Sequence, residues 1–230
     1  MKLPNKQCTT ETAIAKIRDG DTIMVGGFGV PGTPMTLIHA LVAHGARDLT
    51  LVKNDANEPG LGIDHLLRSG QVRRLITTHL GLNAYAIELM NTAKLEVEFN
   101  AQGILAERIR AGGSGLAGIL TDIGIGTELA EGKQEIEFEG KRQIIEAALR
   151  ADVALIHAER ADVFGNLEFA ATAQNFNPLM AMAADCVIAE TVNLLPVGGL
   201  NPNNVQTAGV FIDHVTELTA LTKEYAVVKR

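Results

Sequence analysis

The chain has 230 residues, of which 47% are apolar, and a formal net charge of −7 at pH 7, so we expect a single domain over residues 1–230 with a sizeable buried core. The acidic balance argues against nucleic acid or an anionic membrane as the main partner. No apolar run is long enough for a membrane span or a signal peptide, and two distant cysteines, Cys8 and Cys186, indicate a reducing compartment, so we expect a cytoplasmic protein.

The first hundred residues alternate between helix and strand patterns. A helix capped by Thr10 and ended by Gly20 comes first. We then expect strands at 22–25, 49–52, 75–78 and 95–99, separated by helices at 34–45, 63–67 and 84–90. Such short alternation favours parallel strands with helices on both faces of the sheet.

The pattern changes in the second half of the chain. Glycines crowd residues 112–127, so an irregular, hinge-like segment is expected there. Two hairpins are predicted, one pairing 134–138 with 142–146 and one pairing 153–157 with 167–169. A helix at 177–182 and strands at 186–189 and 210–212 complete an α/β fold whose mixed sheet is mostly parallel.

The run from Asp19 to Pro34 is the most informative stretch. It combines a turn, an apolar strand, a loop with four glycines in residues 26–32, and a helix start. Glycine lets backbone N–H groups approach an anion closely, and the start of a helix points its positive end at the same place. The run therefore predicts a pocket for a phosphate, a pyrophosphate or a developing oxyanion, unless the glycines serve only tight packing.

A dinucleotide-binding loop is an alternative interpretation. Residues 27–32 fit the pattern G-x-G-x-x-G between a strand and a helix. The acidic residue expected at the end of the second strand arrives only at Asp55, after Lys53 and Asn54, so the fit is loose. This interpretation implies an NAD(P)-dependent oxidoreductase.

The same run resembles the first signature of the family I CoA-transferases. The matching positions are Asp19-Gly20, Ile23-Met24-Val25, Gly26-Gly27-Phe28 and Gly32-Thr33-Pro34. Residues 49–55, 101–113, 151–156 and 175–178 are similar to the A (alpha) subunit of the acetate/acetoacetate and 3-oxoacid CoA-transferases. The resemblance implies the CoA-transferase (NagB/RpiA-like) fold.

The resemblance also implies an activity that needs a partner. An alpha subunit would work with a beta subunit to move CoA between short-chain carboxylic acids such as acetate, butyrate, acetoacetate or succinate. The ping-pong reaction passes through a glutamyl-CoA intermediate on the beta subunit, where the family's nucleophile lies in a Ser-Glu-Asn-Gly signature. This chain contains no Glu-Asn-Gly, so we expect it to be inactive alone. A non-catalytic module that senses CoA or a sugar phosphate is a further alternative.

Site residues follow from the resemblance. Gln102 is similar to the family's oxyanion donor, and Asn54, at the carboxyl end of a strand, is a candidate substrate contact. We expect no metal, because none of the six histidines shows metal-ligand spacing. Cations available for an anionic cofactor are Lys53, Arg73, Arg74, Arg108 and Arg110. The loop implied to bind CoA or acyl-CoA consists of Gly26, Gly27, Phe28, Gly29, Val30, Pro31 and Gly32.

Overall fold

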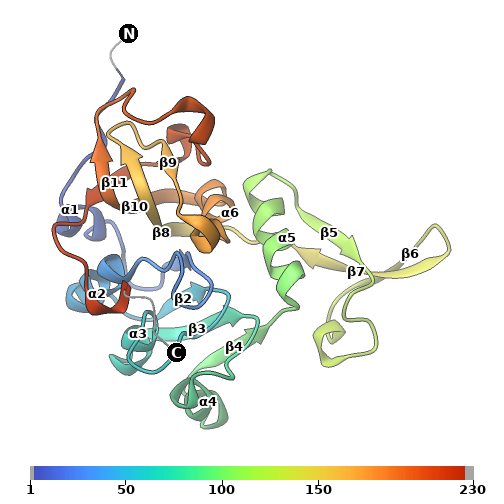
Figure 1. Cartoon of the computed structure of the whole chain (residues 1–230). Coiled ribbons are helices and arrows are strands. Elements are labelled where there is room, and N and C mark those ends of the chain that lie inside the picture. Colours follow the sequence, from blue (N-terminus) through green and yellow to red (C-terminus); the bar gives the residue numbers. More distant parts are fainter. Residues whose placement is uncertain (1–2, 226–230) are drawn as a thin grey trace.

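The computed structural model describes residues 3–225, which fold around one large sheet with the strand order β11-β10-β8-β1-β2-β3-β4 (Figure 1). The strands of this sheet are parallel, apart from the short β9, which pairs antiparallel with β8. The helices are α1 (Thr10–Ile14), α2 (Met35–His44), α3 (Asp64–Arg68), α4 (Ala84–Asn91), α5 (Gln102–Gly113) and α6 (Asn177–Met182). The strands are β1 (Thr22–Val25), β2 (Leu49–Val52), β3 (Val72–Thr77), β4 (Glu96–Phe99), β5 (Gly118–Thr121), β6 (Glu135–Phe138), β7 (Lys141–Ala147), β8 (Ala151–Asp162), β9 (Leu167–Glu168), β10 (Ala184–Leu195) and β11 (His214–Glu217).

Helices cover both faces of the sheet. Successive strand residues point to opposite faces, so Ile23 and Val25 of β1 pack with helices α1 to α4, whereas Met24 packs with α5 and α6. The two resulting hydrophobic clusters share the sheet as their common wall. The predicted α/β class, with a mostly parallel sheet and helices on both faces, is confirmed.

A second, smaller sheet of order β5-β7-β6 projects from the body beyond α5 (Figure 1). Its β6–β7 hairpin turns at Glu139 and Gly140, which both have positive φ angles, 51° and 72°. A two-residue turn of this kind matches the twist of the strands that it joins, as the sequence predicted. A hairpin of β8 and β9 does form, but the predicted pairing is wrong: β9 pairs with Arg160 and Ala161 at the end of the longer β8, and residues 153–157 lie between β1 and β10 instead.

The strand order reverses between β1 and β8. Strands β2, β3 and β4 follow on one side of β1, and β8, β10 and β11 lie on the other. In open parallel sheets, ligands bind at such a reversal, beyond the carboxyl ends of the strands. The loop at residues 26–32 leaves β1 at this edge, so the topology puts it where a ligand is expected.

Several predicted boundaries are wrong. Helix α1 is capped by Thr9, whose side chain accepts a hydrogen bond from the Thr12 N–H, and it ends at Ile14 rather than near Gly20. The segment 112–127, predicted to be irregular, contains the end of α5 and strand β5. The last strand begins at His214, because residues 209–211 form a short 3-10 turn that exposes Val210.

Among residues 3–225, no helix combines the length and the apolar character needed to cross a bilayer.

Candidate active site

The loop contains four glycines, and at three of them close packing leaves no room for a side chain. A Cβ on Gly26 would lie 2.0 Å from Asn177 Oδ1, and one on Gly27 would lie 2.1 Å from Thr33 Oγ1. A Cβ on Gly32 would meet the Ala173 carbonyl oxygen at 2.4 Å. Packing therefore explains these glycines without a ligand, whereas Gly29 faces open space with a φ of +59°.

Lys53 supports the loop from below. Its side chain is completely buried, and the ammonium donates hydrogen bonds to the carbonyl oxygens of Gly26 (3.2 Å) and Gly27 (3.4 Å) and to Thr33 Oγ1 (3.1 Å). Burial lowers the pKa of Lys53, and the nearby Asp55 carboxylate opposes part of that effect. Lys53 is thus a structural cation, unavailable to a phosphate.

Asp55 fixes the middle of the loop. Its carboxylate accepts hydrogen bonds from the Gly29 N–H (2.8 Å), the Asn54 side-chain amide (2.9 Å) and the Asn57 N–H (2.8 Å). Burial alone would raise the pKa of Asp55, but the Lys53 charge and these hydrogen bonds outweigh it and lower the pKa. Because this carboxylate is fully engaged, it is not available to a ribose, as a dinucleotide-binding loop would require.

The start of helix α2 is occupied by protein groups. The Leu37 N–H donates to Glu190 Oε2 at 2.9 Å, and the Thr36 N–H donates to the Tyr225 hydroxyl at 2.8 Å. Glu190 is fully buried and also receives hydrogen bonds from Tyr225 and from His157 Nδ1. The prediction that this helix end points at a bound anion is wrong, since a buried carboxylate already fills that position.

Two asparagines hold the loop from the other side. Asn175 donates from Nδ2 to the Pro31 carbonyl oxygen at 2.9 Å, and Asn177 donates from Nδ2 to the Gly32 carbonyl oxygen at 3.1 Å. Asn177 Oδ1 in turn accepts from the His157 N–H at 3.2 Å. Both residues belong to the stretch 175–178, which was noted for its resemblance but was given no role from the sequence.

Gln102 and Asn54 are brought together. Gln102 is the first residue of α5 and is exposed, and its Nε2 donates to Asn54 Oδ1 at 2.8 Å. Asn54 is fully buried, and its side-chain amide donates a hydrogen bond to Asp55, which also accepts one from the Gly29 N–H. Asn54 is therefore placed to orient the Gln102 amide, and within residues 3–225 no acceptor takes the second hydrogen of that amide.

Backbone donors remain on the loop itself. Within residues 3–225, the N–H groups of Gly27, Val30 and Gly32 donate no hydrogen bond; Gly27 and Gly32 are buried, whereas Val30 is half-buried and Phe28 is 47% exposed. The half-buried Val30 N–H and the exposed Phe28 side chain lie on one loop and suit a ligand that has both polar and apolar parts.

The arginines named from the sequence do not gather into a cationic site. Arg108 and Arg74 both bind the Glu98 carboxylate, at 2.5 Å and 2.6 Å. Burial acts to raise the pKa of Glu98, but these two guanidinium groups prevail and lower it. Arg73 pairs with Glu96, and Arg110 with Glu107.

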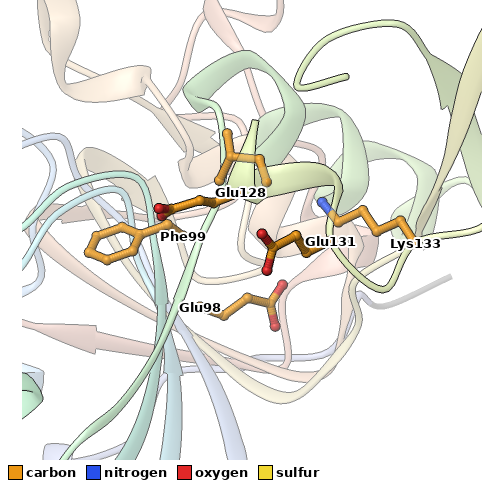
Figure 2. Close-up of a pocket in the computed structure, with 6 residues that line it drawn as sticks. Glu98, Phe99, Glu128, Glu131 and Lys133 are labelled. Carbon is orange, nitrogen blue, oxygen red and sulfur yellow. The ribbon is translucent and has the colours of Figure 1, made fainter. Parts of the chain in front are cut away.

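A cavity of about 400 Å³ lies beside the carboxyl end of β4 (Figure 2). Its lining contains three carboxylates and one ammonium group, so the negative charge predominates. An acidic cavity disfavours the phosphates of a nucleotide cofactor. The lining residues are Glu98, Phe99, Glu128, Leu129, Glu131 and Lys133.

Comparison with known proteins identifies the class. The coenzyme A transferase family profile matches residues 8–218. The chain superimposes on an acyl-CoA transferase from Escherichia coli O157:H7, solved as a thioester complex with CoA, with a TM-score of 0.84 and 23% identity. The superposition covers 98% of this chain and 49% of that one. This chain belongs to the coenzyme A transferase family.

Within the family, the similarity is to alpha (A) subunits. The chain is 46% identical over 222 residues to a probable coenzyme A transferase subunit alpha of Bacillus subtilis, covering 96% of this chain and 97% of the relative. It is 45% identical over 213 residues to the acetate CoA-transferase subunit alpha of Escherichia coli K12, covering 93% and 97%.

Proposed function

We propose that this chain is the alpha subunit of a two-subunit CoA-transferase that exchanges CoA between short-chain carboxylic acids. Relatives are named for acetate, for succinyl-CoA and 3-ketoacids, and for 3-oxoadipate. The observation that carries the proposal is the continuous hydrogen-bond path from Gln102 through Asn54 and Asp55 to Gly29. That path fixes an exposed amide donor beside the glycine loop.

The chemistry assigns the two subunits different tasks. A glutamate carboxylate of the partner attacks the thioester carbonyl, and collapse of the tetrahedral intermediate releases the CoA thiolate and leaves a mixed anhydride. The thiolate then attacks the glutamyl carbonyl, which forms the enzyme thioester and frees the first acid. The second acid reverses both steps. In this scheme, Gln102 donates to the oxyanion of each tetrahedral intermediate, where one donor contributes on the order of 3 kcal/mol.

The loop at residues 26–32 is proposed to hold the CoA portion. This role is supported by the partly accessible Val30 N–H, the exposed Phe28 and the place of the loop at the reversal of strand order. We propose that the partner supplies part of the positive charge for the CoA phosphates, since Lys53 is buried and the candidate arginines pair with carboxylates.

The test is CoA exchange between acetoacetyl-CoA and acetate, measured for the chain alone and after co-expression with a beta subunit. We expect activity only from the pair. Gln102→Ala in the pair should lower kcat by roughly 100-fold or more, whereas Gln143→Ala, in the small sheet, should leave it unchanged. Full activity of the chain alone would refute the partner requirement, and an unchanged rate for the Gln102 variant would remove this residue from the reaction.

A further inference from the structure

Three potential metal ligands from separate segments meet at one place. His39 lies on α2, His65 lies on α3, and Glu224 lies in the short 3-10 turn at Lys223–Tyr225. Glu224 is 185 residues from His39 and 159 residues from His65 in the sequence. No local spacing could have revealed this cluster, and the sequence-based expectation of no metal rested on local spacing alone.

The geometry brings the donor atoms within reach of one ion. His39 Nε2 lies 2.6 Å and His65 Nε2 lies 3.2 Å from the same oxygen, Glu224 Oε1. One donor atom from each of the three residues lies within 4.8 Å of the others. Two imidazole nitrogens and one carboxylate oxygen form a donor set typical of zinc sites that keep a fourth position for water.

Glu224 is held in place independently of the two histidines. The next residue, Tyr225, inserts its hydroxyl between the Thr36 N–H and the buried Glu190 carboxylate. The Gly62 N–H donates to the second carboxylate oxygen, Glu224 Oε2, at 3.3 Å. The third ligand is therefore pre-positioned, as a functional metal site requires.

The cluster is also accessible. The side chain of His39 is 40% exposed and that of His65 is 27% exposed, whereas Glu224 is 15% exposed. An ion can enter from solvent while the carboxylate stays in a partly desolvated position, where its charge attracts a cation more strongly.

We propose that His39, His65 and Glu224 bind a divalent first-row transition ion of the zinc, cobalt and nickel class, and that the ion ties residues 223–225 to helices α2 and α3. Both imidazoles bind the ion as neutral groups, so binding releases any proton that a ring shares with the carboxylate. The site is independent of the proposed CoA chemistry and does not require it.

Cobalt titration of the untagged full-length chain, first stripped with a chelator, tests the proposal. We expect one cobalt per chain, with the intense visible absorption of four-coordinate cobalt. His39→Ala, His65→Ala and Glu224→Gln should each weaken binding roughly 100-fold or more, since loss of an outer-shell partner alone costs 10–100-fold. The matched control is His44→Ala, which removes the other histidine of α2 and should leave the titration unchanged.

A second measurement guards against variants that fold poorly. Zinc should raise the Tm of the wild-type chain and of the His44 control but not that of Glu224→Gln, which replaces only one oxygen near the end of the described chain. No cobalt binding by the wild type would show that the cluster is only a hydrogen-bonded histidine–carboxylate group, and would overturn the proposal. Binding that survives all three ligand substitutions would place the ion elsewhere and would overturn it equally.

Discussion

Lys53 and Asp55 carry opposite charges beneath the glycine loop, and both are buried. The Lys53 charge helps to lower the pKa of Asp55, so removing it leaves the buried carboxylate less well compensated. Lys53→Met would also leave two loop carbonyl oxygens and Thr33 Oγ1 without their donor.

We therefore expect Lys53→Met to lower the free energy of unfolding by on the order of 3 kcal/mol, as measured in denaturant. Lys141→Met, at an exposed position of β7, is the control and should change it by no more than about 0.5 kcal/mol. A loss below about 1 kcal/mol for the Lys53 variant would contradict the role assigned to the buried ammonium.

Asp55 gives a prediction about acid stability. Because folding lowers the pKa of Asp55, the ionised carboxylate stabilises the folded state fully above its unfolded pKa of about 3.9. That stabilisation is lost as the pH falls through the lower, folded-state pKa. Asp55→Asn should thus be less stable than the wild type near neutral pH, and the difference should shrink as the pH falls below about 4.

Urea unfolding at a series of pH values measures this difference directly. Asp122→Asn, at an exposed carboxylate, provides the matched control, for which we expect no such convergence. A gap between wild type and Asp55→Asn that stays constant from about pH 6 to pH 3 would be inconsistent with the linkage.

At the scale of elements, the loop at residues 26–32 and helix α6 pack so closely that a single methyl group should separate them. A Cβ on Gly26 would overlap Asn177 Oδ1, the atom that accepts the His157 N–H. Gly26→Ala should therefore cost about 2–3 kcal/mol in the wild-type chain, but less than about 1 kcal/mol when Asn177 is already alanine.

A double-mutant cycle of Gly26→Ala and Asn177→Ala, followed by denaturant unfolding, measures that coupling. Gly20→Ala, which has a φ of +83° and open space around it, isolates the cost of backbone strain alone, about 1–2 kcal/mol. Equal costs of Gly26→Ala in the two backgrounds would mean that Asn177 is not what excludes a side chain at this position.

The sequence predicted those elements whose signals are local. Apolar strands followed by turn residues located β1 to β4, and Glu139-Gly140 located the β6–β7 turn. Helix α5 was not predicted, because its last turn runs into glycine pairs that usually mark irregular structure.

The arrangement of the site was harder to predict because its contacts cross the sheet. Asn177 donates a hydrogen bond to Gly32, which lies 145 residues away in the sequence. Glu190 accepts one from Leu37 at the start of α2, which lies 153 residues away. The resemblance implies Gln102 and the loop as candidate site residues, but only the folded chain reveals that Asn54 is buried and hydrogen-bonded to Gln102.

For the whole molecule, the arrangement of charges argues for a second subunit. The two carboxylates that contact the loop and the start of α2, Asp55 and Glu190, are both buried and hydrogen-bonded. Neither is free to attack a thioester, and the chain contains no Glu-Asn-Gly, which together support our proposal that the nucleophile belongs to the partner subunit.

The most direct measurement is to locate the covalent intermediate. The complex of this chain with its beta subunit is incubated with acetoacetyl-CoA, reduced with borohydride, digested and analysed by mass spectrometry. We predict a reduced glutamyl residue on the beta subunit and an unmodified alpha subunit. A modified glutamate or aspartate on this chain would contradict the claim that it supplies the oxyanion donor and the CoA loop while its partner supplies the nucleophile.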